Sequence, residues 1–238
     1  AEYFLQPEFS QKYSVVQPVP VFSEERCDGC GLCTRECRFH ALYKIMKTVY
    51  LSEPLCHGCG LCEMVCPQKA ISYQDAAVGH IRSGYSPRTR NNVHVGDLKI
   101  GSTRGTYLIG EMVKRINPDK LSVIDGPPGN SCAAVAAIKP ADLVVLVVEP
   151  TPFGFHDMQQ TQQILEQMDK NYLIIANKSM GDSGVDTFFM GKSKQAVLTI
   201  ALDDRYHIAN LEGKILSQQF SEIHSGLSRV ISPELTNQ

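Results

Sequence analysis

Two short cysteine-rich segments with identical spacing constrain the fold more than any other feature of the chain. Each has the pattern C-x2-C-x2-C-x3-C, and the second repeats the first at a constant offset of 29 residues. The eight positions are Cys27, Cys30, Cys33, Cys37, Cys56, Cys59, Cys62 and Cys66. This is the ligand spacing of two [4Fe–4S] clusters, so we predict a protein that carries electrons or senses redox state.

The similarity between the two segments extends beyond their cysteines. Ser23-Glu24 recurs as Ser52-Glu53, and Ala41-Leu42 recurs as Ala70-Ile71. An internal duplication predicts two similar half-units that pack on each other, here within residues 21–80. A zinc or disulfide knuckle is the alternative, and the duplicated three-step spacing disfavours it.

The fourth cysteine of each set is expected to serve the other set's cluster, as in two-cluster ferredoxin units. The first cluster is then assigned to Cys27, Cys30, Cys33 and Cys66. The second cluster is assigned to Cys56, Cys59, Cys62 and Cys37. We interpret His57 as an exposed loop histidine rather than a ligand. Cys132, the ninth cysteine, is expected to be buried and apolar in role, with contact to a metal or to a partner's cofactor as the alternative.

Composition and charge narrow the class of protein. Hydrophobic residues make up 43% and charged residues 20% of the chain, which is typical of a globular protein. The net charge of −2 gives no electrostatic reason to expect nucleic acid or an anionic membrane as a partner. The longest aliphatic run, residues 143–148, is too short to span a bilayer. The opening residues lack a signal-peptide pattern, and cluster ligation needs reduced thiols, which favours the cytoplasm.

The pattern changes after a polar stretch at residues 83–92, which we predict to be a linker. A second break is predicted at the proline-punctuated residues 17–20. Helical spacing follows at residues 105–116 and 157–169. Unbroken apolar runs predict strands at residues 121–124, 143–148, 172–176 and 196–202. Such runs separated by helices are typical of a parallel sheet covered on both faces.

The expected carboxyl ends of these strands carry polar residues. Asp125, Glu149, Asn177 and Asp203 each follow a predicted strand. Ligands of parallel α/β sheets bind beyond this edge. We therefore predict a ligand site there, although a bare strand-to-helix turn is the alternative explanation for Asp125 and the glycine-proline turn after it.

Several segments together resemble the MinD/Mrp superfamily of P-loop ATPases. Within that superfamily, they are similar to the branch with a ferredoxin domain inserted in the ATPase domain. The segments are Asp125-Gly-Pro-Pro-Gly129, Glu149-Pro-Thr-Pro-Phe-Gly-Phe-His-Asp157, Asn177-Lys178, Phe4-Leu-Gln-Pro-Glu8 and Leu98-Lys-Ile-Gly101. The resemblance implies an α/β fold in which residues 1–20 and 81–238 form a P-loop NTPase-like domain. Residues 21–80 would be the inserted α+β bacterial-type 2[4Fe–4S] ferredoxin domain.

The same resemblance implies roles for three residues. Asp125 would be the catalytic acid that holds Mg²⁺ and water, Gly129 would lie in the turn that senses the γ-phosphate, and Asn177 would contact adenine. ATP and Mg²⁺ would then be cofactors beside the clusters. The partner would be a redox protein or a protein of metal-cofactor assembly, and this protein would act as a homodimer or heterodimer.

The family's glycine-rich Walker A loop has no counterpart in this sequence. Residues 186–193 end in Gly-Lys-Ser, but they lack the required first glycine and precede a predicted strand, so we reject them as a phosphate site. We expect a longer natural protein; a strand from another chain and a closed-up, non-hydrolytic sheet are the alternatives. Three functions stay open: a nucleotide-coupled iron–sulfur ATPase, a non-hydrolytic electron-transfer or adaptor subunit of a larger redox complex, and a cluster-transfer scaffold.

Overall fold

The computed structural model describes residues 1–181 and 198–236. These residues divide into two compact units, one of residues 7–121 and the other of residues 1–6 with the chain from residue 122 onward. The rejected Gly-Lys-Ser segment at 186–193 lies outside the described residues. The predicted domain boundaries after residues 20 and 80 fall inside strands β1 and β4, and they stay predictions.

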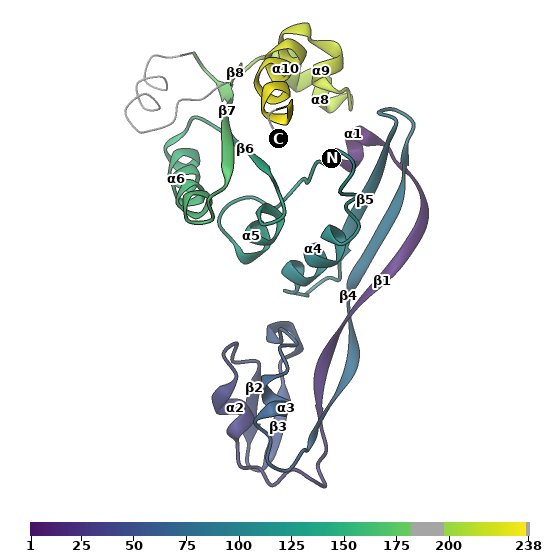
Figure 1. Ribbon diagram of the computed structural model, residues 1–238, viewed down its shortest axis with the longest axis vertical. Coiled ribbons are helices and arrows are strands. Elements are labelled where there is room, and N and C mark those ends of the chain that lie inside the picture. The colour runs from purple at the N-terminus through teal and green to yellow at the C-terminus, as the bar shows by residue number, and fades with distance from the viewer. Residues whose placement is uncertain (182–197, 237–238) are drawn as a thin grey trace. The chain divides into compact units, whose positions relative to one another are not determined.

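The first unit is built on a long antiparallel sheet (Figure 1). Its strands are β1 (Glu8–Phe22), β4 (Ile71–Ser86) and β5 (Asn91–Leu98), in the order β1-β4-β5. Helix α4 (Gly105–Val113), predicted from its apolar spacing, packs on this sheet. Its buried Leu108 meets Val15, Val78 and Ile81 in a shared core.

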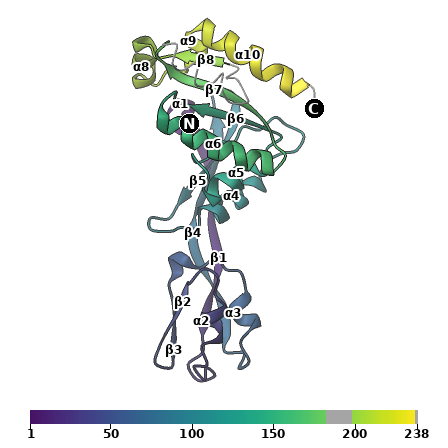
Figure 2. The same ribbon diagram turned by 90° about the vertical axis from the view of Figure 1, so that its left-hand side faces the viewer.

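Between β1 and β4 the chain forms the cysteine-bearing half-units, seen best in Figure 2. The first contains α2 (Leu32–Glu36), β2 (Leu42–Ile45) and β3 (Thr48–Leu51), and β2 pairs antiparallel with β3. The second contains a 3-10 helix, η1 (Glu53–Leu55), and α3 (Leu61–Met64), and then enters β4. Buried side chains from both half-units share one core, which includes Cys33, Leu42, Val49 and Ile71.

The other unit contains the predicted parallel sheet. Strands β6 (Leu143–Val148), β7 (Asn171–Ser179) and β8 (Leu198–Ala201) run parallel in the order β6-β7-β8, as predicted from their apolar runs. The described residues of this unit form helices α1 (Glu2–Leu5), α5 (Cys132–Ile138), α6 (Pro152–Gln167), α8 (Asp204–Leu211), α9 (Leu216–Gln219) and α10 (Ser221–Thr236). Leu165 of α6 and Ile174 of β7 are almost fully buried in the core between helix and sheet.

Two predicted breaks in the first unit are wrong. Pro18 and Pro20 lie inside β1, which is the edge strand of its sheet, and an edge strand tolerates proline because one side of its backbone has no ladder hydrogen bond to lose. The polar residues 83–92 form a hairpin between β4 and β5 rather than a linker. The Ser83 hydroxyl and His94 Nδ1 form a hydrogen bond of 2.7 Å across it.

Two predictions in the other unit also need correction. The strand predicted at residues 121–124 is wrong: residues 121–127 have no regular secondary structure and lie outside the β6-β7-β8 sheet. Val123 is 90% exposed. Helix α6 begins at Pro152, five residues before the predicted start at 157. The Thr151 hydroxyl accepts a hydrogen bond of 3.0 Å from the amide of Gly154 and so caps the helix, and proline suits the first helical position.

Candidate metal centres

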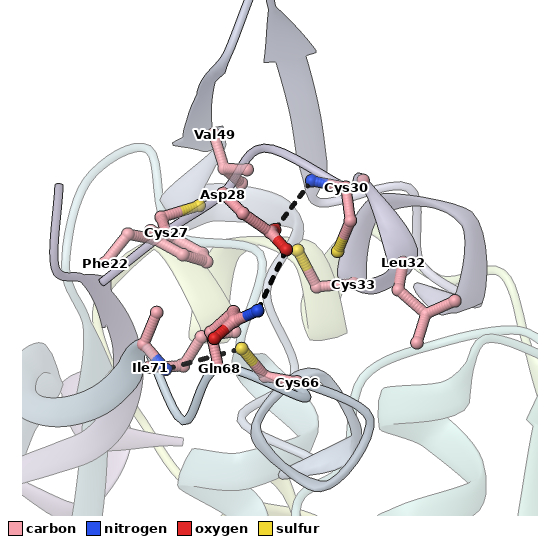
Figure 3. A pocket seen from close by; sticks show the side chains of 12 residues that line it. Phe22, Cys27, Asp28, Cys30, Leu32, Cys33, Val49, Cys66, Gln68 and Ile71 are labelled. Atoms are coloured by element: carbon pink, nitrogen blue, oxygen red, sulfur yellow. Dashed lines mark hydrogen bonds between the residues drawn. The ribbon is translucent and has the colours of Figure 1, made fainter. Parts of the chain in front are cut away.

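Four cysteines line a hollow to which both half-units contribute. Three come from the first set and the fourth comes from the second set: Cys27, Cys30, Cys33 and Cys66. Figure 3 shows their side chains around the hollow, with those of Asp28 and Gln68. The empty space is about 330 Å³ with its open mouth included. The sequence's assignment of one cluster to these residues therefore corresponds to four sulfurs around one space.

A second hollow has the complementary set. Its cysteines are Cys56, Cys59, Cys62 and Cys37. The empty space here is about 360 Å³, similar to that of the first hollow. All eight cysteines are free of disulfide bonds. Among the described residues, no three His, Cys, Asp or Glu side chains converge closely enough to hold a single metal ion.

The loops before α2 and α3 depend on glycine at equivalent positions. Gly29 has a φ of +70°, and a Cβ placed there would lie 2.9 Å from the carbonyl oxygen of Lys47. Gly58 has a φ of +60°, and a Cβ there would lie 2.8 Å from the carbonyl oxygen of Pro18. A larger residue would therefore be strained in φ and would also clash with backbone. These glycines let the first loop pass close to the turn between β2 and β3, and the second pass close to β1.

The environments of the cysteine sulfurs suit binding of a cluster by thiolates. Backbone amides of Gly58 and Ala70 donate to the sulfurs of Cys56 and Cys66, each over 3.4 Å. Burial raises the pKa of the thiols of Cys33, Cys56 and Cys62. Thiolate ligation to iron would therefore release protons. The residues present fit two iron–sulfur clusters: they supply only sulfur ligands, partly buried, with amide donors to the sulfurs.

The two hollows differ in the side chains that flank them, although these occupy equivalent positions in the duplication. Beside the first, the Asp28 carboxylate accepts hydrogen bonds from the Cys30 amide at 3.0 Å and from Gln68 Nε2 at 3.1 Å. These bonds, the amide first, lower the pKa of Asp28. Beside the second, the His57 ring stacks on Phe39 with ring centroids 3.8 Å apart. His57 is exposed, as predicted.

A second equivalent pair differs in the same way. Lys44 of β2 donates from Nζ to the Gly29 carbonyl oxygen over 2.7 Å. Its counterpart, Tyr73 of β4, has its hydroxyl 3.4 Å from the sulfur of Cys62. Burial, followed by the hydrogen bond with Cys62, raises the pKa of Tyr73, which keeps this hydroxyl protonated. The sequence analysis missed both residues, although the constant offset of 29 would have placed them at matching positions.

Support for the second hollow comes from residues far away in the sequence. The buried side chain of Gln17 donates from Nε2 to the carbonyl oxygen of His57 over 2.6 Å. Arg104, whose side chain is 4% exposed, donates to Glu53 over 2.6 Å. Glu53 begins the 3-10 helix that leads into Cys56. No spacing signal in the sequence links these residues to the cysteines, because the links form only in the folded chain.

The residues predicted to bind nucleotide lie on separate segments. Asp125 is 74% exposed and its carboxylate lies 3.4 Å from the amino group of Ala1. Gly129 has a φ of +78° in the loop before α5. Asn177 lies inside β7, not beyond it, because pairing with β8 continues to Ser179. Within the described part of the chain, no hydrogen bond or ion pair joins Asp125, Gly129 and Asn177 to one another. Their predicted roles stay predictions.

Other predicted residues have structural roles or a different environment. Glu149 and Lys178 form an ion pair at the carboxyl ends of β6 and β7. Asp203 caps α8, with its carboxylate accepting from the Arg205 amide over 2.8 Å. Cys132 is exposed, so the expectation that it is buried is wrong. Helix α5 buries Ala134 and Ala137, and a residue two positions before Ala134 lies on the opposite face of a helix.

Comparison with known proteins decides the nature of the cysteine segments. The family described as "4Fe-4S binding domain" matches residues 20–43 and again residues 49–72. Each segment is a ferredoxin-type 4Fe-4S binding repeat. Two such matches favour two [4Fe–4S] clusters. The combination of an iron–sulfur domain and a mixed α/β structure with a parallel sheet is therefore confirmed.

Two relatives come from Methanocaldococcus jannaschii. The uncharacterized protein MJ0578 is 35% identical over 156 residues, which cover 64% of this chain and 53% of the relative. The uncharacterized protein MJ0579 is 28% identical over 112 residues, which cover 45% of this chain and 40% of the relative. The chain thus spans about half or less of the length of these relatives. The resemblance to MinD/Mrp ATPases stays a prediction.

In the described part of the chain, no helix combines the length and the apolar character that a bilayer crossing requires.

Proposed function

We propose that this protein transfers electrons through two [4Fe–4S] clusters held in crossed sets by the eight repeat cysteines. The observation that supports the proposal best is the lining of the two hollows. Each contains three cysteines from one repeat and the last cysteine of the other. A crossed pair of clusters requires this exchange. When bound, such a cluster supplies reversible one-electron transfer.

Each half-unit also offers a route for electrons to enter and leave. Cys30 and Cys59 occupy equivalent positions and are exposed, whereas Cys33 and Cys56 are buried. The buried sulfurs hold a cluster away from water, and the exposed sulfurs bring it near the surface where a redox partner docks. A chain with one such cysteine at each hollow suits a relay between two partners, which is how we interpret the adaptor or electron-transfer role.

The first experiment measures metal on the 238-residue chain purified without oxygen. We expect about eight iron and about eight sulfide per chain, as two cubane clusters require. Reduction of the clusters should produce an EPR signal. Four iron and four sulfide per chain, or zinc in place of iron, would contradict the proposal.

Nucleotide coupling of the MinD/Mrp type is the second candidate function. The parallel sheet favours this function, because ligands of such sheets bind beyond the carboxyl ends of the strands. The ion pair of Glu149 and Lys178 lies at these ends of β6 and β7. In this proposal Asp125 holds Mg²⁺ and water, Gly129 faces the γ-phosphate and Asn177 contacts adenine, in a homodimer or heterodimer that serves a redox or cofactor-assembly partner.

Calorimetry with ATP and Mg²⁺ tests this candidate on the cluster-loaded chain and on a version extended upstream. Binding that Asp125→Asn weakens would support it. Absence of binding by both chains would exclude it and leave the electron-transfer proposal in place.

A further inference from the structure

The wall of the second hollow contains a hydroxyl group that reaches a ligand sulfur. Tyr73 of β4 is half-buried and lines this hollow, with its hydroxyl 3.4 Å from Cys62 Sγ. Cys62 belongs to the set that we assign to the second cluster. A cysteine that binds iron is a thiolate and has no proton to give. In the loaded protein the hydroxyl is therefore the donor and the sulfur the acceptor.

The equivalent position beside the first hollow does not make this contact. Lys44 stands 29 residues before Tyr73, and its ammonium group donates to the Gly29 carbonyl oxygen over 2.7 Å. Both halves of the duplication thus have the ligand cysteines. Of the two equivalent positions, only Tyr73 forms an O–H···S hydrogen bond, and Lys44 does not. The difference lies in a residue that contacts a ligand and is not itself one.

We propose that the Tyr73 hydroxyl raises the reduction potential of the second cluster by donating to the Cys62 sulfur. The inference rests on the proposed function. Reduction adds one electron, and part of the added charge resides on the ligand sulfurs. A hydrogen-bond donor stabilises the more negative state, and hydrogen bonds to the sulfurs are among the factors that set cluster potentials. The hydroxyl keeps its proton throughout, so the step moves an electron and no atom.

The partly buried position of Tyr73 strengthens the effect. A hydrogen bond to a charged acceptor is stronger than one between neutral groups, and it is stronger still away from bulk water. Tyr73 is a positioning residue rather than a ligand, since its hydroxyl contacts the Cys62 sulfur and not the iron. Its removal should change the potential and leave the eight ligands in place.

The test is Tyr73→Phe in the full chain, loaded without oxygen and titrated electrochemically with EPR detection. Phenylalanine keeps the ring and removes the donor. We expect one of the two reduction steps to move to lower potential, with the ratio of reduced to oxidised cluster at fixed potential falling about tenfold, or about 59 mV for one electron. Tyr43→Phe is the matched control, because Tyr43 is 49% exposed and stacks on Tyr50. It should shift neither step.

An unchanged step, a rise in potential, or an equal shift of both steps with Tyr73→Phe would overturn the inference. If that variant loads only one cluster, the wild-type sequence grown with 3-fluorotyrosine decides. Fluorine makes the phenol a stronger donor without changing the fold, so one step should move to higher potential, and no shift would overturn the inference. A wild-type chain without about eight iron would instead overturn the proposed function itself.

Discussion

The crossing of the cysteine sets can be tested by asking which variants have the same effect. Cys37 lies in the first sequence segment but lines the second hollow, together with Cys59. Cys66 lies in the second segment but lines the first hollow, together with Cys30. If the hollows hold the clusters, Cys37→Ser should damage the same cluster as Cys59→Ser. Cys66→Ser should damage the same cluster as Cys30→Ser.

The size of the effect follows from the number of ligands. Each hollow has four cysteines, so each variant removes one ligand of four from one cluster and none from the other. Iron should fall from about eight per chain toward about four, and one of the two EPR signals should disappear or change shape. Cys132→Ser is the control, because Cys132 lies outside both hollows and is exposed. It should keep about eight iron.

Iron and sulfide analysis and EPR on all four variants give a clear decision. If the spectrum of Cys37→Ser matches that of Cys30→Ser and differs from that of Cys59→Ser, each sequence segment holds its own cluster. The crossed assignment would then be wrong, even with about eight iron in the wild type.

Three further predictions concern the stability of residues 7–121, measured by urea unfolding of the loaded chain. Glu53→Gln leaves the buried guanidinium of Arg104 without its carboxylate and should lower the free energy of unfolding by about 2 kcal/mol, less than for a fully buried pair because Glu53 is 43% exposed. The double variant with Arg104→Met should regain part of this stability. Additive losses in the two single variants and the double variant would contradict the ion pair. Asp97→Asn should cost less than about 1 kcal/mol at pH 7. The hydrogen bond from Arg82 lowers the pKa of Asp97 below the ordinary 3.8, so its stabilisation is present above that value and is lost as the pH falls through the lowered pKa; a cost that does not begin to shrink as the pH falls below 3.8 would refute this. Gly29→Ala should destabilise the first cluster's loop by about 1 to 3 kcal/mol through its positive φ and its close backbone contact, and an unchanged urea midpoint would contradict the strain.

The sequence was sufficient where a residue's role depends on its neighbours in the chain. The cysteine spacing identified the repeats, and unbroken apolar runs identified β6 and β7, because a strand buried in a parallel sheet needs apolar residues on both faces. Residues 121–124 have the same kind of run and form no strand. An apolar run indicates a strand only if a partner strand is present, and that information is not local.

The interpretation of prolines failed for a related reason. Pro18 and Pro20 lie in the stretch that the sequence predicts to be a break, and proline cannot donate to a strand ladder. In the structure they lie in an edge strand, where that donor is not needed. The position of a strand within its sheet decides whether proline is allowed, and that position is set by long-range pairing. Arg104 and Gln17 were missed for the same reason, since each acts on a residue 40 or more positions away.

The duplication separates what holds a cluster from what adjusts it. Both halves keep the cysteine spacing and the loop glycines, since the ligands and the tight turns leave no freedom at these positions. The flanking side chains have diverged, with Asp28 and Lys44 beside one hollow and His57 and Tyr73 beside the other. Charges and hydrogen bonds around a cluster change its potential without changing its ligands. If the clusters transfer electrons as proposed, unlike neighbours will give them unequal potentials, and an electron that reaches the pair will reside mainly on the cluster with the higher potential.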